Sequence, residues 1–199
     1  MTITNGYTTL ATVRSLIGIP ATDTSSDSLI EASIEAVSRL IDNYTGRRFY
    51  VAEETRAYTP ITSDEVWVDD VTSITSLKSD DNEDGTYEVT WQTTDYNLLP
   101  YNASISGKPY TRIETSGYGN YEFSITRRSL QVVGAFGYCT TSNLPKPVAE
   151  AAKIQSVRIF KRKDLPYGVV GGGEMAQPVS IPELDPDVKT LLDPYRKRL

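Results

Sequence analysis

The stretch DDNEDG, which begins at Asp80, has the residue types and spacing of a calcium-binding loop. Asp80, Asn82 and Asp84 occupy the first, third and fifth ligand places of an EF-hand loop. Gly85 falls where such a loop turns sharply. The twelfth place, which requires a bidentate carboxylate, is Trp91, and the flanking residues are typical of strands. We therefore expect a hairpin turn without a functional metal site, and leave weak cation binding open.

The rest of the composition argues against catalysis. The chain has no histidine, which excludes a Ser-His-Asp triad, an HExxH zinc motif and histidine acid–base catalysis. Its one cysteine, Cys139, excludes an internal disulfide and a cysteine-rich zinc site. The glycines at 171–173 lack the Lys-Ser/Thr of a phosphate loop and predict a flexible linker. We expect no catalytic residue, no metal and no cofactor, and keep a carboxylate-dependent hydrolase as an alternative.

Charge is distributed unevenly along the 199 residues. The net charge of −6 consists of −1 in residues 1–49, −8 in residues 50–140 and +3 in residues 141–199. An acidic middle and a basic end predict electrostatic complementarity between copies or with a partner. The negative total argues against nucleic-acid binding as the main function. No apolar run approaches the roughly 20 residues of a membrane span, and the first residues lack a signal-peptide pattern.

Three segments with apolar residues at helical spacing predict the helices of the fold. The first helix runs from Thr8 or Thr9 to about Ile17. The second runs from about Ser25 to Tyr44, with a capping box and a C-cap glycine; its ends and apolar stripe are Thr24, Asp27, Leu29, Ile30, Ala36, Val37, Leu40, Ile41, Tyr44 and Gly46. The third runs from about Pro147 to Lys163; its stripe is Ala151, Ala152, Ile154, Val157 and Phe160. We expect the second and third helices to pack together.

Residues 50–140 differ in composition from the rest of the chain. They are rich in Thr, Tyr, Val, Ile and Ser, and contain the alternating runs VTSITSLKS, TYEVTWQ, YTRIETS, YEFSIT and SLQVVGAFGY. Such runs predict five or more strands in an antiparallel sheet or small barrel, with NLLPYNA as a connection between strands. The fold class is therefore α+β, with about four helices and a large antiparallel β-rich insertion. We divide it into a helical core (1–49 and 141–164), an inserted module (50–140) and a tail (165–199).

The tail combines a loop rich in glycine and proline with a short amphipathic helix. That helix begins at Asp185, extends over about fourteen residues, and is kinked or broken at Pro194. Its apolar side consists of Val188, Leu191, Leu192 and Tyr195, and Arg196 follows it. Two outcomes are open: the helix docks on a partner, or it folds back and completes the core of its own subunit.

The two ends of the chain resemble the head–tail connector (adaptor) proteins of tailed bacteriophages. The resemblance is carried by YTTLATVRSLIGI, by TDTSSDSLIEASIEAVSRLIDNYTGRRFY and by IPELDPDVKTLLDPYRKRL. In that pattern a long helix ends in an aromatic residue, Thr or Cys, Gly, Arg and an aromatic residue, here Tyr44, Thr45, Gly46, Arg47 and Phe49. The departure is the β-rich insertion, because the smallest members of the family are nearly all helical.

The resemblance implies a structural virion protein at the head–tail neck, assembled in the bacterial host cytoplasm. Copies would form a twelvefold ring beneath the portal protein, extend the DNA channel and offer a platform to a neck, stopper or tail protein. DNA would pass without sequence-specific binding, and no membrane or enzymatic activity is implied. The alternative is a β-rich binding module of a virion or cell surface that recognises carbohydrate or a host.

Candidate interface residues follow from these expectations. Arg47 and Arg48 lie just beyond a helix end, where arginine suits pairing with carboxylates of a neighbouring subunit. In the tail, we expect the docking residues to be Val188, Leu191, Leu192, Tyr195 and Arg196. These seven residues are interface candidates, for either the portal or an adjoining subunit.

Overall fold

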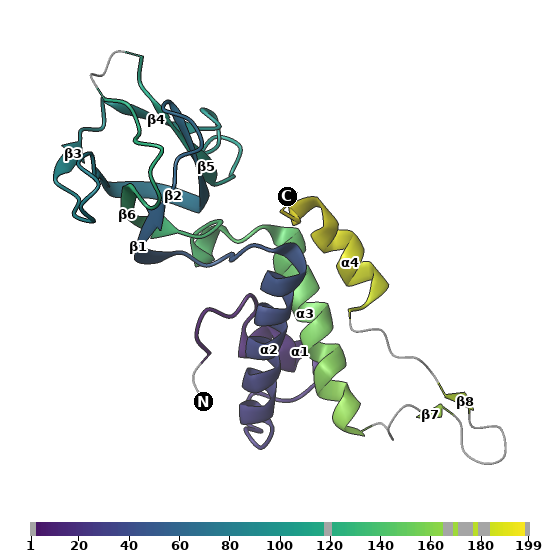
Figure 1. Cartoon of the computed structure of the whole chain (residues 1–199). Helices are drawn as coiled ribbons and strands as arrows, with labels where there is room; N and C mark the ends of the chain where they lie inside the picture. The colour runs from purple at the N-terminus through teal and green to yellow at the C-terminus, as the bar shows by residue number, and fades with distance from the viewer. Residues whose placement is uncertain (1–2, 118–120, 165–168, 171–176, 179–183, 198–199) are drawn as a thin grey trace. The chain divides into compact units, whose positions relative to one another are not determined.

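A computed structural model describes residues 3–117, 121–164, 169–170, 177–178 and 184–197 (Figure 1). The chain divides into a helical unit, Met1–Arg47 with Leu144–Leu199, and a β unit, Arg48–Asn143. Within the described residues, the two units hold four α-helices and a six-stranded antiparallel sheet, which confirms the α+β class. Among the described residues, every helix is too short or too polar to cross a membrane.

The first two helices begin and end where local sequence signals place them, with one exception. Helix α1 (Leu10–Ile17) is capped by the Thr9 hydroxyl and ends at Gly18, whose φ of 83° is left-handed. Helix α2 (Asp27–Thr45) ends at Gly46 in the same conformation. The expected capping box is absent from its start, because the Asp27 carboxylate pairs with an arginine of α1.

Helix α2 packs against α3 (Lys146–Lys161), as expected, and the two lie side by side in Figure 1. The fully buried stripe of α2 is Ile30, Ile34, Val37 and Ile41. These positions are spaced by four, three and four residues, and so form one line along the helix. The prediction for this stripe was partly wrong: Leu29 and Ala36 are exposed, and Leu40 is only half-buried.

A small core joins α1 to these two helices. It consists of the buried side chains of Val13, Ile30, Ile34 and Phe160. In α3, Ile154 and Val157 are half-buried rather than central, and the polar Gln155 is fully buried. The short helix η2 (Arg162–Asp164) continues α3.

The C-terminal segment contains a two-stranded ladder and a short helix. Strands β7 (Val169–Val170) and β8 (Gln177–Pro178) pair antiparallel, and residues 171–173 lie outside the described residues. Helix α4 (Pro186–Leu192) starts where proline at its first turn predicts, and η3 (Asp193–Tyr195) follows. The expected break at Pro194 is confirmed, so the α-helix has seven residues rather than about fourteen.

The β unit is one antiparallel sheet with the strand order β1-β6-β2-β5-β4, and β3 pairs with β2. The strands are β1 (Ala52–Tyr58), β2 (Glu65–Ser79), β3 (Val89–Trp91), β4 (Tyr96–Leu99), β5 (Tyr110–Thr115) and β6 (Leu130–Phe136), and η1 (Thr141–Asn143) ends the unit. The long β2 pairs with β5 through its first half and with β6 through its second half, with register shifts. Its two halves therefore line one core with different partners.

Two of the strand predictions were wrong. Residues 121–126, YEFSIT, form no strand; instead Phe123 is buried and stacks on Trp91, with ring centroids 4.7 Å apart. Residues 97–99, expected in a connection, belong to β4. In both places packing against neighbouring segments, which a local pattern does not report, decides the structure.

Candidate functional site

Hydrogen bonds and an ion pair hold the start of the tail helix, α4, against α3. The Asp185 carboxylate caps α4 by accepting from the Asp187 N–H at 3.0 Å, and it also pairs with the Arg158 guanidinium. The buried Gln155 amide oxygen accepts from the Asp185 N–H at 3.3 Å. The buried Gln155 amide oxygen is thus paired with a backbone N–H at the start of α4, as buried polar groups usually are.

The apolar side of α4 faces its own subunit. Val188 and Leu192 are fully buried in the helical unit, and Leu184, two residues before α4, is also buried. Leu191 and Tyr195 are half-buried, and Arg196 is exposed. The fold-back outcome is therefore the one that the structure shows for α4. Val188 and Leu192, two of the expected docking residues, fill the subunit's own core, because burial there removes their apolar surface from water.

The end of the tail meets the end of α2. The Tyr44 hydroxyl donates to Asp193 at 2.6 Å, and the Lys197 N–H donates to the Thr45 carbonyl at 2.7 Å. The hydrogen bond to Asp193 raises the pKa of Tyr44. Arg196 lies over the Tyr44 ring, 5.3 Å from its centroid. Sequence reasoning named both ends of the chain separately but did not pair them.

Both expected interface arginines make contacts within their own subunit. Arg47 is half-buried, and its backbone N–H donates to the Asp42 carbonyl. Arg48 is held within the β unit: its guanidinium pairs with Glu54 and donates to the Phe136 carbonyl at 2.6 Å. Burial alone would raise the pKa of Glu54, but Arg48 and Arg56 outweigh burial and lower it. Arg48 therefore has a carboxylate partner in its own subunit.

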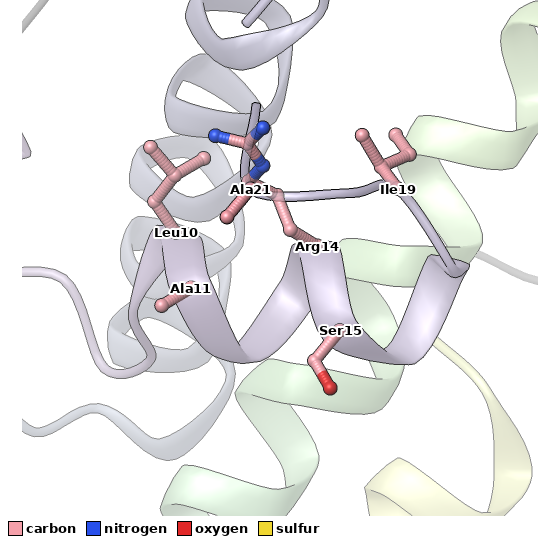
Figure 2. A pocket seen from close by; sticks show the side chains of 6 residues that line it. All are labelled: Leu10, Ala11, Arg14, Ser15, Ile19 and Ala21. Atoms are coloured by element: carbon pink, nitrogen blue, oxygen red, sulfur yellow. The ribbon is translucent and has the colours of Figure 1, made fainter. Parts of the chain in front are cut away.

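A pocket of about 370 Å³ lies between α1 and the loop that follows it (Figure 2). Its lining is Leu10, Ala11, Arg14, Ser15, Ile19 and Ala21. Arg14, only 8% exposed, pairs with Asp27 at 3.0 Å and donates to the Pro20 carbonyl at 2.6 Å and to the Asp23 carbonyl. The guanidinium of Arg14 holds the loop to both helices. We therefore assign this pocket a structural role and not a role in binding or catalysis.

The acidic loop joins β2 to β3, as the hairpin prediction requires. Ser79 pairs with Val89 across the ladder, and Gly85 has a left-handed φ of 90°. Within the loop, Asp80, Asp84 and Glu88 each offer a carboxylate oxygen, and the three oxygens lie within 4.8 Å of one another. Sequence reasoning overlooked Glu88, eight residues after Asp80, because it looked for the third carboxylate at the position of Trp91.

Comparison with known proteins identifies the family. The sequence profile of the head completion proteins matches residues 7–198. A search of curated proteins finds no match. The fold resembles chains in "Neck of empty GTA particle computed with C6 symmetry" (TM-score 0.62, 17% identity, 100% of this chain and 94% of that chain) and in "Neck of native GTA particle computed with C12 symmetry" (0.60, 16%, 100% and 93%).

A third structure of this fold is "Virion of native gene transfer agent (GTA) particle" (TM-score 0.62, 16% identity, 100% of this chain and 94% of that chain). At such identities these likenesses show the fold alone, whereas the family profile covers nearly the whole sequence. The chain therefore belongs to the head completion protein family and is a structural head–tail connector protein.

Proposed function

We propose that copies of this chain form a ring at the neck of the particle, beneath the portal protein. The ring extends the DNA channel and gives a platform to the next neck, stopper or tail protein, and the chain catalyses no reaction. The observation that carries the proposal is the family match over residues 7–198. Two of the matched structures support a ring, because they are described as necks computed with C6 and C12 symmetry. We take twelve as the subunit number.

A closed ring of identical subunits uses heterologous contacts, so one face must complement a different face. The chain carries the asymmetry that such contacts require, because its net charge is −8 in residues 50–140 and +3 in residues 141–199. On the helical unit, Lys189, Arg196 and Lys197 are exposed. On the β unit, Glu53, Glu83 and Asp81 are exposed. Pairing of these opposite charges on neighbouring subunits would fix the orientation of the ring.

Of the seven interface candidates, five keep part of their surface exposed in the folded subunit: Arg47, Arg48, Leu191, Tyr195 and Arg196. Arg196 and Tyr195 are next to the hydrogen bond between Lys197 and Thr45, which fixes the backbone at this point. We propose that this corner of the helical unit contacts the portal or the adjoining subunit. We also propose that the chain is divided into a connector core, an inserted module and a tail. In this division, α4 anchors the tail to the core of its own subunit.

We propose that DNA passes through the channel without sequence-specific binding. The negative total charge of the chain supports this, because numerous lysine and arginine contacts to phosphates would hold the DNA in place. The protein has no need of a membrane in this role. The basic residues that remain exposed serve protein contacts in this account.

Native mass spectrometry of the purified protein, alone and with its portal protein, tests the proposal. We expect a closed oligomer, alone or on the portal, that dissociates as salt is raised, because screening weakens pairing between exposed charges. The variant Arg196→Glu should weaken assembly, and Lys153→Glu, which changes the same charge on α3, serves as the control. A protein that stays monomeric with and without the portal would contradict the ring, and binding to glycans instead would favour the carbohydrate-binding alternative.

A further inference from the structure

We propose that the loop between β2 and β3 binds one calcium ion, with Asp80, Asp84 and Glu88 as its carboxylate ligands. The family relationship does not assign this site, and the role at the neck does not require it. The proposal depends on two separate observations: the convergence of three carboxylates, and a buried carboxylate oxygen that has no donor.

The first observation is the geometry of the cluster. One oxygen from each of Asp80, Asp84 and Glu88 lies within 4.8 Å of the other two. Two oxygens that share a calcium ion, at about 2.3–2.6 Å each, are at most about 5 Å apart. The three oxygens therefore already satisfy the distance condition for a shared calcium ion without movement of the backbone.

The second observation concerns Asp80. Asp80 is only 7% exposed, and its Oδ1 has no hydrogen-bond partner among the described residues. The other oxygen, Oδ2, accepts from the Gly85 N–H at 2.9 Å. A buried carboxylate oxygen without a partner is costly, and a bound cation would compensate that cost.

The base of the loop is held in place before any ion binds. The Asp80 N–H donates to the Ser129 carbonyl at 2.8 Å, and the Trp91 indole N–H donates to the Ser79 hydroxyl at 2.9 Å. Trp91 is itself buried against Phe123. Asp80 therefore projects from a rigid base, while Asp84 and Glu88 are exposed and both accept from the Thr86 hydroxyl.

The charges in the loop need a balancing group. The Asn82 side-chain amide lies between two of the carboxylates, with its nitrogen 2.9 Å from Glu88 Oε1 and 3.4 Å from Asp84 Oδ2. A neutral amide offsets only a small part of this repulsion, whereas a divalent ion would offset most of it. Of the two other acids of the loop, Glu83 accepts from the Thr126 hydroxyl at 2.6 Å, and neither Glu83 nor Asp81 belongs to the cluster.

The ligand set favours calcium over magnesium. All three ligands are carboxylate oxygens, which both ions accept. Magnesium requires near-octahedral geometry with oxygens at about 2.0–2.1 Å and gives up its water reluctantly. Calcium tolerates irregular geometry and fills its remaining positions with water. A loop with one buried ligand and two exposed ligands, which leaves room for water on one side, suits the larger ion.

Calorimetric titration of the full-length protein, stripped of metal by chelation, tests the proposal with calcium chloride and magnesium chloride as probes. We expect one saturable calcium site per chain, with a Kd between about 10 µM and 1 mM, and weaker magnesium binding. Asp84→Asn and Glu88→Gln should each weaken calcium binding by about tenfold or more, since charged ligands set the affinity of such loops. Both residues are exposed, so these variants should fold.

Asp81→Asn is the matched control, because it removes one charge from the same loop outside the cluster and should leave the Kd unchanged. Calcium should also raise the Tm of the wild-type protein and of this control, but not of Glu88→Gln. Three results would overturn the proposal: no saturable heat up to about 10 mM calcium, well above the range of weak calcium modules; equal binding by wild type and both ligand variants; or magnesium binding as tight as calcium.

Discussion

Replacing Leu192 by alanine tests whether α4 is part of the subunit's own core. Leu192 is fully buried, and α4 packs mainly against α3. A Leu→Ala change at a fully buried site costs about 2–5 kcal/mol, depending on how far the surroundings close the cavity. Because α4 is a single short helix that can shift toward α3, we expect about 2–3 kcal/mol, in the lower half of that range.

The measurement is chemical denaturation of the monomer, followed by circular dichroism at the wavelength of the helix signal. The expected loss corresponds to a fall in Tm of about 4–12 °C for a protein of this size. Leu191→Ala is the matched control: the neighbouring side chain is only half-buried, and its loss should cost less than about 1 kcal/mol. If Leu192→Ala leaves stability unchanged but abolishes portal binding, then α4 is a docking element and our account of the tail is wrong.

Three further predictions concern other parts of the chain. Arg14→Met should destabilise the helical unit by about 3 kcal/mol in denaturation experiments, because it leaves the Asp27 carboxylate unpaired; a loss below about 1 kcal/mol would contradict this. Gly137→Ala should prevent folding of the β unit, seen as loss of its sheet signal, because φ is 142° and a Cβ would lie 2.1 Å from the Tyr50 carbonyl oxygen; native stability would refute it. Burial raises the pKa of the Cys139 thiol to about 11, so alkylation at pH 8 should be much slower in the native protein than in urea, and equal rates would show an accessible thiol.

Local signals in the sequence were sufficient for most helix boundaries. Gly18 and Gly46 end α1 and α2, and proline at the first turn starts α4. These signals work because they act through the backbone within one turn of the helix. The capping box at Asp27 failed for a non-local reason, since Arg14, thirteen residues earlier in the chain, takes the carboxylate.

The sheet and the sites were harder to predict because they depend on contacts between distant segments. Phe123 lies in a segment with strand-like alternation but fills the core from irregular backbone. The link between Tyr44 and Asp193 joins residues 149 positions apart. In the acidic loop, the sequence indicated Asp80 and Asp84, but only the folded backbone brings Glu88 to them.

The charge pattern made a more general prediction than any single motif. It indicated a protein that assembles through complementary surfaces, and this stays a prediction. It did not show that Arg48 would be paired with Glu54 inside its own subunit. A net charge summed over a segment does not distinguish solvated residues from those already paired.

Cryo-electron microscopy of assembled particles that contain this chain is the most direct test of its place at the neck. Our account predicts a ring of twelve copies directly below the portal protein, with each copy showing the four helices and the six-stranded sheet described above. The corner formed by Tyr195 and Arg196 should contact the portal or the adjoining subunit. Density for the chain elsewhere on the particle, or a neck built without it, would contradict the account.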